Sequence, residues 1–191
     1  MAALASKANF KIKGLKTDSL QGDAIVKEIF EPLGVKTTQD SDGVTLTKVK
    51  RKVNFFEYDF THNPDLVPTM VATCVALKVP FKFTGIEVLR HKDVDRVMVL
   101  QSQMSKLGAK LVFDKFGQFE TLSFDGQANI PASGSMVFNS FSDQRIVMSL
   151  APLSILGLQI TIDDPKVVSK SYPCYWRDYK KVNIDIDQSV Q

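Results

Sequence analysis

A short charged stretch, RHKDVDR at residues 90–96, holds side chains whose types and spacing could do chemistry. It combines three cations, two carboxylates and a histidine. Lys92 and Arg96 are four residues apart, so on a helix they would share one face. With the free N–H groups of a helix N-terminus, these two cations could hold an anion such as a phosphate. The alternative is a solvated helix face, on which Asp93 and Asp95 only complement the helix dipole.

The neighbouring segments indicate that this stretch lies in a turn between a strand and a helix. Residues 82–88, KFTGIEV, are rich in β-branched and aromatic residues and are expected to form a strand. Apolar residues then recur at helical spacing over 94–107, and Gly108 is expected to end that helix. Residues 23–34 carry the same helical pattern. Further strands are expected at GVTLTKV (43–49) and LQITI (158–162).

The chain also repeats itself at an offset of roughly 70 residues. The blocks 1–48 and 70–123 each read as an apolar helix, a strand, a polar turn, an amphipathic helix and a hairpin, and a shorter copy begins at 145–173. We therefore expect an α/β (α+β) fold built from βαβαββ units, with 1–191 forming one domain. The expected repeat bounds are about 1–60, 61–130 and 131–191, the first and last being incomplete.

Composition excludes several classes of protein. The net charge of +3 comes from lysines and arginines spread along the chain, so it is weak evidence for nucleic-acid binding. Cys74 and Cys174 lie far apart and outside any CxxC pattern, which predicts neither a disulfide framework nor a zinc site. Cys74 lies in an apolar run and is expected to be a buried thiol.

No apolar run reaches the roughly 18 residues of a membrane span, and the first residues do not resemble a signal peptide. A cytoplasmic location is the expectation.

Five segments resemble motifs of the 5-enolpyruvylshikimate-3-phosphate (EPSP) synthase family, in the family's order and at similar spacing. RHKDVDR resembles the family's R-x-K-E-x-D-R motif, and TDSLQGD (17–23) resembles S-x-Q-G-D. The other three are THNPDLVPTM (61–70), SDQRIVM (142–148) and DPKVVSKSYPCYW (164–176). They resemble N-x-P-D, D-H-R-M-A-M and the family's D-P-x-x-x-x-K-S/T-F/Y-P ending. Each motif alone would be weak, but together they cover nearly the whole chain.

The resemblance covers only the C-terminal half of the family's enzyme. It implies one lobe of an inside-out α/β barrel, made of βαβαββ units, with the N-terminal lobe as the missing partner. It also implies that the lobe takes one further strand from the extreme N-terminus of the full enzyme. The activity implied is transfer of the enolpyruvyl group of phosphoenolpyruvate to the 5-hydroxyl of shikimate 3-phosphate, with release of phosphate. No metal or organic cofactor is implied, and neither nucleic acid nor a membrane is expected as a partner. A single lobe is expected to be inactive alone.

By the same resemblance, Asp65 and Asp93 would be the catalytic carboxylates. Asp65 would contact shikimate 3-phosphate and move the proton of its 5-hydroxyl. Asp93 would move the proton at the methylene group of phosphoenolpyruvate. Lys92 would lie beside the phosphate of shikimate 3-phosphate. Phosphoenolpyruvate would be bound by Arg96, Arg145 and Lys170.

Three of these residues also have a purely structural interpretation. Asp65 follows a proline and could be a helix N-cap. Arg145 could form a surface pair with Asp143, and Lys170 could be an ordinary solvated lysine. The two histidines, His62 and His91, are expected to be surface residues.

Two departures from the family pattern leave the activity open. Asp93 replaces a glutamate and is one methylene shorter, and a displacement of about 1 Å can cost roughly a hundredfold in rate. Gln144 replaces a histidine and cannot titrate near neutral pH. The alternatives are therefore a weakened enzyme, or a non-catalytic anion-binding or scaffold relative that kept the fold. The sister transferase acting on UDP-N-acetylglucosamine is a further alternative, which KSYP and SLQGD disfavour.

Overall fold

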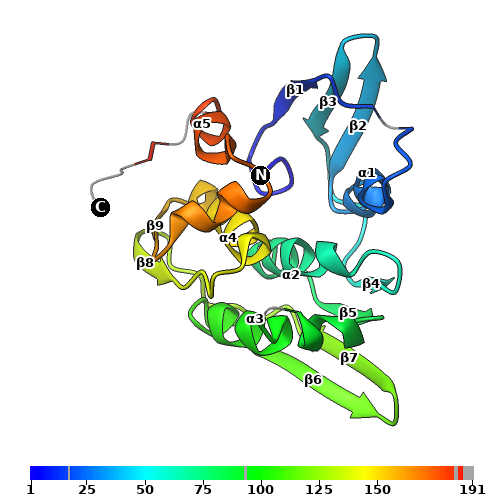
Figure 1. Cartoon of the computed structure of the whole chain (residues 1–191), viewed down its shortest axis with the longest axis vertical. Helices are drawn as coiled ribbons and strands as arrows, with labels where there is room; N and C mark the ends of the chain where they lie inside the picture. Colours follow the sequence, from blue (N-terminus) through cyan, green and yellow to red (C-terminus); the bar gives the residue numbers. More distant parts are fainter. Residues whose placement is uncertain (17, 93, 183–184, 187–191) are drawn as a thin grey trace.

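A computed structural model describes residues 1–16, 18–92, 94–182 and 185–186. Three β-sheets surround a set of central helices (Figure 1). The sheet of β1 to β3 lies at one end of the molecule, the sheet of β4 to β7 lies at the other, and β8 and β9 flank the helices. Within the described residues, no helix is long and apolar enough to cross a membrane.

The middle of the chain folds as strand, helix, strand, helix and hairpin. Its four strands pair in the order β4-β5-β7-β6, with β4 and β5 parallel and the others antiparallel. The strands are β4 (Phe56–Asp59), β5 (Phe81–Thr84), β6 (Leu111–Phe116) and β7 (Phe119–Phe124). The helical elements are η2 (Pro64–Leu66), α2 (Val67–Ala76), η3 (Glu87–His91) and α3 (Arg96–Ser105). This order is the βαβαββ unit that the repeat predicted.

The first sheet repeats part of this arrangement. Its strand order, β1-β3-β2, has the same form as β5-β7-β6. The strands are β1 (Asn9–Lys13), β2 (Val35–Asp40) and β3 (Gly43–Lys48), and the helical elements are η1 (Gly22–Ile25) and α1 (Val26–Phe30). The third sheet pairs β8 with β9 in parallel, as β4 pairs with β5. We propose that the three sheets mark three units, each centred near one predicted repeat.

The third sheet is followed by the C-terminal helices. Its strands are β8 (Gly134–Phe138) and β9 (Leu158–Ile162), joined through α4 (Gln144–Leu150) and η4 (Ala151–Leu156). The remaining elements are η5 (Pro165–Lys170) and α5 (Tyr175–Lys180). The expected strand at 158–162 is confirmed.

Three sequence-based expectations about element bounds were wrong. The first residues form turns rather than an apolar helix, because so short a run does not repay the cost of helix nucleation. The helix expected at 23–34 begins as η1 and ends at Phe30, two residues before Pro32, which has no N–H to continue it. The strand expected at 82–88 ends at Thr84, since Gly85 turns the chain with a φ of +67° and η3 follows.

The core is centred on α2, which packs against both α3 and α4 (Figure 1). Five of its side chains are completely buried: Val67, Met70, Val71, Cys74 and Val75. Because α2 buries side chains on every face, other elements must cover it on all sides. This explains why α2 lies inside the molecule and the sheets lie outside it. The buried thiol predicted for Cys74 is confirmed, and burial raises its pKa to about 12.

Candidate functional site

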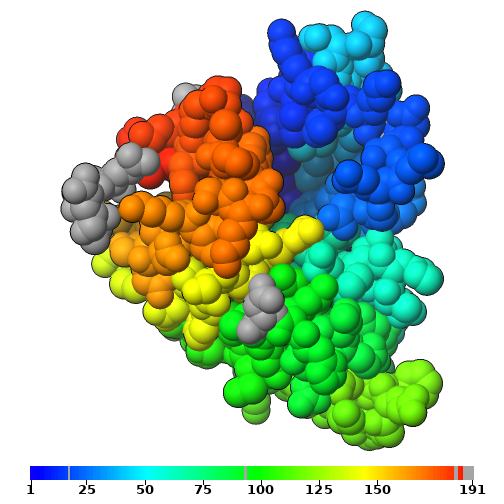
Figure 2. Space-filling view, viewed as in Figure 1, coloured from blue at the N-terminus to red at the C-terminus, as the bar shows by residue number. Residues whose placement is uncertain are grey.

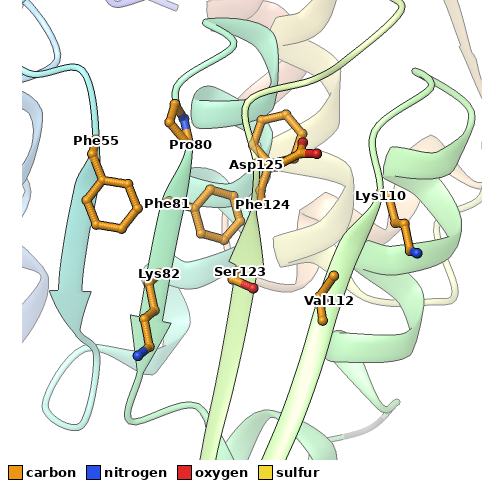
Figure 3. Close-up of a pocket in the computed structure, with 9 residues that line it drawn as sticks. All are labelled: Phe55, Pro80, Phe81, Lys82, Lys110, Val112, Ser123, Phe124 and Asp125. Atoms are coloured by element: carbon orange, nitrogen blue, oxygen red, sulfur yellow. The ribbon is translucent and has the colours of Figure 1, made fainter.

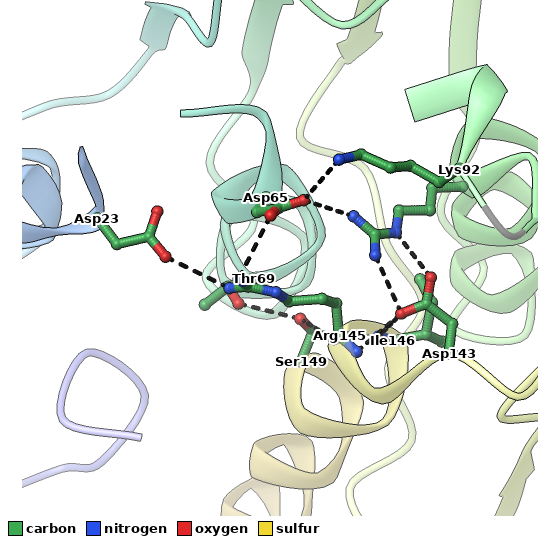
Figure 4. Close-up of polar contacts among 9 residues, drawn as sticks. Asp23, Asp65, Thr69, Lys92, Asp143, Arg145, Ile146 and Ser149 are labelled. Carbon is green, nitrogen blue, oxygen red and sulfur yellow. Dashed lines mark hydrogen bonds and ion pairs between the residues drawn. The ribbon is translucent and has the colours of Figure 1, made fainter. Parts of the chain in front are cut away.

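The beginnings of three helical elements meet at one place. Asp65 lies in η2, directly before α2, while Arg96 is the first residue of α3 and Asp143 is the N-cap of α4. Figure 4 shows the polar contacts that join these helix ends. In the space-filling view, the yellow surface around α4 meets the green surface around α3 (Figure 2). The packing of α2 against α3 and α4 thus brings together residues that are far apart in the sequence.

Asp65 is at the centre of this group and is surrounded by cations. Its Oδ1 lies 2.7 Å from Arg96 Nη1 and 3.4 Å from Lys92 Nζ, and its Oδ2 lies 3.3 Å from Arg145 Nη2. Partial burial opposes the charged form, but Arg96, Arg145 and Lys92 outweigh it and hold the pKa of the Asp65 carboxyl below its ordinary value. The helix N-cap interpretation of Asp65 is wrong, because the N-cap position of η2 is Asn63.

Arg96 is buried and is held by a second carboxylate. Its Nε lies 2.7 Å from Asp143 Oδ2 and its Nη2 lies 3.3 Å from Asp143 Oδ1, a two-point contact. The exposed fractions of the two side chains are only 7 % and 1 %. Burial disfavours the guanidinium charge, but hydrogen bonds to Asp143 and Asp65 raise the pKa of Arg96. Such a two-point contact fixes the plane of the guanidinium as well as its charge.

Asp143 is a site residue that sequence reasoning missed. Its Oδ1 also accepts hydrogen bonds from the backbone N–H groups of Arg145, at 2.8 Å, and Ile146, at 3.4 Å. It therefore caps α4 and anchors Arg96 with the same carboxylate. An aspartate directly before an apolar helical run was the available signal for the cap. Nothing local in the sequence indicated the buried partner, which lies 47 positions away.

Arg145 reaches toward Asp65 and away from Asp143. Its guanidinium lies 3.3 Å from Asp65 Oδ2 and 3.4 Å from Asp23 Oδ2 (Figure 4). The interpretation of Arg145 as a surface partner of Asp143 is therefore wrong. Asp23 ends the TDSLQGD stretch, so the first unit also contributes a carboxylate to this site.

The side chains of Lys92 and Arg96 both reach Asp65, but the two residues do not share a helix face as expected. Lys92 precedes α3 in an extended backbone conformation, and only Arg96 belongs to the helix. The backbone N–H groups of Val97 and Met98 donate to Asp95, the N-cap of α3. These two donors are therefore satisfied by the chain itself. An anion here would be bound mainly by side-chain cations.

The remaining predicted residues lie at or beyond the margin of the cluster. Lys170 donates to the carbonyl oxygen of Ser142 at 3.0 Å, next to Asp143 in the sequence. Within the described part of the chain, it forms no hydrogen bond or ion pair with Asp65. Ser142 and Phe141 both have positive φ, in a turn closed by the hydrogen bond from Asp143 N to Ser140 O at 3.0 Å. Asp93, the second predicted carboxylate, lies outside the described residues.

The described residues include no group of three or more His, Cys, Asp or Glu side chains arranged to hold a metal ion. A separate pocket of about 420 Å³ lies over the sheet of β4 to β7 (Figure 3). Its wall is mainly aromatic and apolar, with lysines at the edge, and none of the predicted site residues lines it. The cluster around Asp65 is therefore the candidate site.

The comparisons with known proteins agree on one family. The sequence profile of EPSP synthase (3-phosphoshikimate 1-carboxyvinyltransferase) matches residues 1–179. A 3-phosphoshikimate 1-carboxyvinyltransferase of Bacteroides fragilis is 40% identical over 186 residues, covering 97% of this chain and 44% of the relative. One from Methanosarcina acetivorans is 30% identical over 188 residues, covering 98% and 42%.

Solved structures show the same fold at low sequence identity. EPSP synthase from Acinetobacter baumannii has a TM-score of 0.68 at 18% identity, over 94% of this chain and 43% of that one. The enolpyruvyl transferase NikO from Streptomyces tendae has a TM-score of 0.69 at 17% identity, over 97% and 42%. The predicted fold, one lobe of an enolpyruvate transferase, is thereby confirmed. The chain spans less than half the length of the relatives it matches, and it belongs to the EPSP synthase family.

Proposed function

We propose that this chain supplies one half of the active site of a 3-phosphoshikimate 1-carboxyvinyltransferase. The reaction would transfer the enolpyruvyl group of phosphoenolpyruvate to the 5-hydroxyl of shikimate 3-phosphate and release phosphate. The observation that carries the proposal is the position of Asp65 among Lys92, Arg96 and Arg145. Both substrates are anions with several charges, and such cations bind phosphate and carboxylate groups.

The contacts support different roles for the three cations. Lys92 and Arg145 are about one-third exposed, at 30% and 33%, so an incoming anion can draw them away from Asp65. Lys92 would bind shikimate 3-phosphate, and Arg145 would bind phosphoenolpyruvate together with Arg96 and Lys170. Arg96 would stay in place, because Asp143 holds it from the opposite side.

This exchange of partners would prepare Asp65 for proton transfer. With three cations around it, the Asp65 carboxylate is a poor base because its pKa lies below the ordinary value. Once substrate anions neutralise Lys92 and Arg145, the pKa of Asp65 would rise toward its ordinary range. It could then accept the proton of the 5-hydroxyl of shikimate 3-phosphate. Asp93 would move the proton at the methylene group of phosphoenolpyruvate. This role is a prediction from the sequence motif alone.

The proposal includes a second lobe as an obligatory partner and the cytoplasm as the compartment. The length of the match, less than half of each relative, supports a missing lobe. The two cysteines are free thiols, which supports a reducing compartment. Nucleic acid and membranes are not part of the proposal.

Calorimetry tests whether the substrate site needs both lobes. Shikimate 3-phosphate is titrated into this chain alone, and into its mixture with the N-terminal half of the Bacteroides fragilis relative. We expect weak binding to the chain alone and at least tenfold tighter binding to the mixture, because cations from both lobes then face the substrate. The Lys92→Gln variant should lose most of this gain. Equal affinity with and without the N-terminal half, in a mixture shown to associate, would contradict the proposal.

The non-catalytic alternative has its own supporting observation. Gln144 is the first residue of α4, beside Arg145, where the family motif has a histidine. An amide there cannot exchange a proton, but it leaves the anion-binding cations in place. This candidate predicts substrate binding by the completed protein without turnover.

A further inference from the structure

Glu120, on β7, is a buried carboxylate outside the candidate site. Its side chain is 5 % exposed, and its Oε1 accepts hydrogen bonds from Arg90 Nη1 and Lys115 Nζ, each at 2.9 Å. Its Oε2 is buried without a hydrogen-bond partner among the described residues. Burial opposes the charged form, but Lys115 and Arg90 outweigh it and lower the pKa of Glu120. A carboxylate buried in this way depends strongly on its two partners.

Arg90 connects Glu120 to the start of α3. Its Nη1 binds Glu120, and its Nε lies 3.5 Å from Oδ2 of Asp95. The other oxygen of Asp95 caps α3 by accepting the N–H groups of Val97 and Met98, at 3.0 Å and 3.1 Å. The Arg90 guanidinium also lies over the ring of Phe113 on β6, 5.3 Å from its centroid. One side chain thus joins the hairpin to the helix cap.

The same carboxylate-bearing residue is also tied to the other end of η3. The backbone N–H of Glu120 donates to Glu87 Oε1 at 3.1 Å. Since η3 runs from Glu87 to His91, both of its ends are attached to β7 at one position. Lys92 follows directly, between the attachment at Arg90 and the cap at Asp95. Its ammonium then reaches Asp65 at 3.4 Å.

We propose that Arg90 and Glu120 are positioning residues, which hold the end of η3 and the cap of α3 so that Lys92 points at Asp65 and at an anionic, phosphorylated substrate. They act through Lys92 and contact no substrate themselves. The inference rests on the proposed function for its substrate, but the attachment itself is a property of the free chain. Its effect is to reduce the freedom that Lys92 would otherwise lose on binding an anion.

Lys115 provides a matched control. It donates to the same Glu120 oxygen at the same distance of 2.9 Å, but it lies on β6 and is 53% exposed. Among the described residues, its ammonium forms no hydrogen bond or ion pair with η3 or α3. If Glu120 served only to stabilise the hairpin, Lys115→Gln and Arg90→Gln would have similar effects. If Arg90 and Glu120 position Lys92, only variants at those two residues should weaken the hydrogen bonds at the start of α3.

The first experiment is amide hydrogen exchange on the whole chain, comparing Arg90→Gln, Glu120→Gln and Lys115→Gln. We expect Val97 and Met98 amides to exchange about tenfold faster in the first two variants, from the loss of a charge-assisted hydrogen bond. The Val71 amide within α2 should be unchanged, and Lys115→Gln should resemble the parent. Unchanged exchange at Val97 and Met98 in Arg90→Gln would overturn the proposal. If Glu120→Gln fails to fold, the Arg90 and Lys115 variants still decide it.

The second experiment uses the two-lobe mixture and measures both kinetic constants. Arg90→Gln should raise the KM for shikimate 3-phosphate about tenfold and leave kcat within about threefold, because Lys92 contributes mainly to binding. The double variant Arg90→Gln/Glu120→Gln should be no worse than Arg90→Gln, since the two residues act as one unit. An equal change in Lys115→Gln would contradict positioning. If the parent mixture is inactive, the proposed function fails, while hydrogen exchange still decides the attachment.

Discussion

At the scale of single residues, one carboxylate determines the electrostatics of the candidate site. Asp65 is ionised because three cations favour its charge more than partial burial opposes it. The sequence motifs predicted Asp65, Lys92, Arg96 and Arg145, and the structure brings these four together. The sequence did not predict Asp143 or Asp23 as site residues. Their ion-pair partners are far away along the chain, and only the packing of the helices brings the partners together.

The lowered pKa of Asp65 makes a prediction about stability and pH. Its pKa is lower in the folded chain than the value of about 3.9 expected when unfolded. The charged carboxylate therefore stabilises the fold above about pH 4, and this contribution is lost as the pH falls through the folded pKa. Asp65→Asn should unfold at lower urea concentration than the parent at pH 7, and the difference should shrink toward pH 3. A difference that stays constant over this range would refute the assignment.

The buried pair of Arg96 and Asp143 predicts a larger loss. Asp143→Asn would leave the Arg96 guanidinium buried and short of one partner, and this typically costs about 3–5 kcal/mol of folding free energy. The Arg145→Gln variant is the control, because its one-third exposed pairs should cost about 1 kcal/mol or less. Urea unfolding at pH 7 measures both. A similar loss in the two variants would mean that Asp143 is not a buried anchor.

At the scale of elements, the sequence predicted the types of the long periodic segments better than their ends. The helix expected over 94–107 is α3, and the strands expected at 43–49 and 158–162 are β3 and β9. The ends were set by features that a periodicity does not detect, such as Gly85 after β5 and Pro32 after α1. The first residues were wrongly assigned to a helix because their apolar character reflects contact with Val35 rather than helical periodicity.

The start of α3 carries a prediction at this scale. Asp95 caps the helix through the N–H groups of Val97 and Met98, and removal of such a cap typically costs about 1 kcal/mol, within 0.5–2. Asp95→Ala should lower the free energy of unfolding by this amount, whereas Asp95→Asn should retain most of the cap. Thermal unfolding compares the three proteins. An Asp95→Asn variant as unstable as Asp95→Ala would show that the charge, through Arg90, matters more than the cap.

At the scale of the whole molecule, the fold is defined by helices packed inside three sheets. This arrangement explains why one site collects side chains from several units: the helical elements α2, α3 and α4 begin at the same place. The three repeat units stay a prediction from the sequence, and the meeting point of the helices depends on how the elements pack. In the proposed enzyme this site would face a second lobe, in keeping with a match to less than half of each relative.

Phosphate release tests the central claim most directly. Phosphoenolpyruvate and shikimate 3-phosphate are supplied to this chain alone, to the N-terminal half of the Bacteroides fragilis relative alone, and to the mixture. We predict release only in the mixture, with Asp65→Asn reducing it at least a hundredfold, as expected for loss of a general base. Such a result would make Asp65 part of a shared active site. Silence in a mixture whose lobes are folded, associated and able to bind shikimate 3-phosphate would contradict the account and favour a scaffold that has lost the reaction.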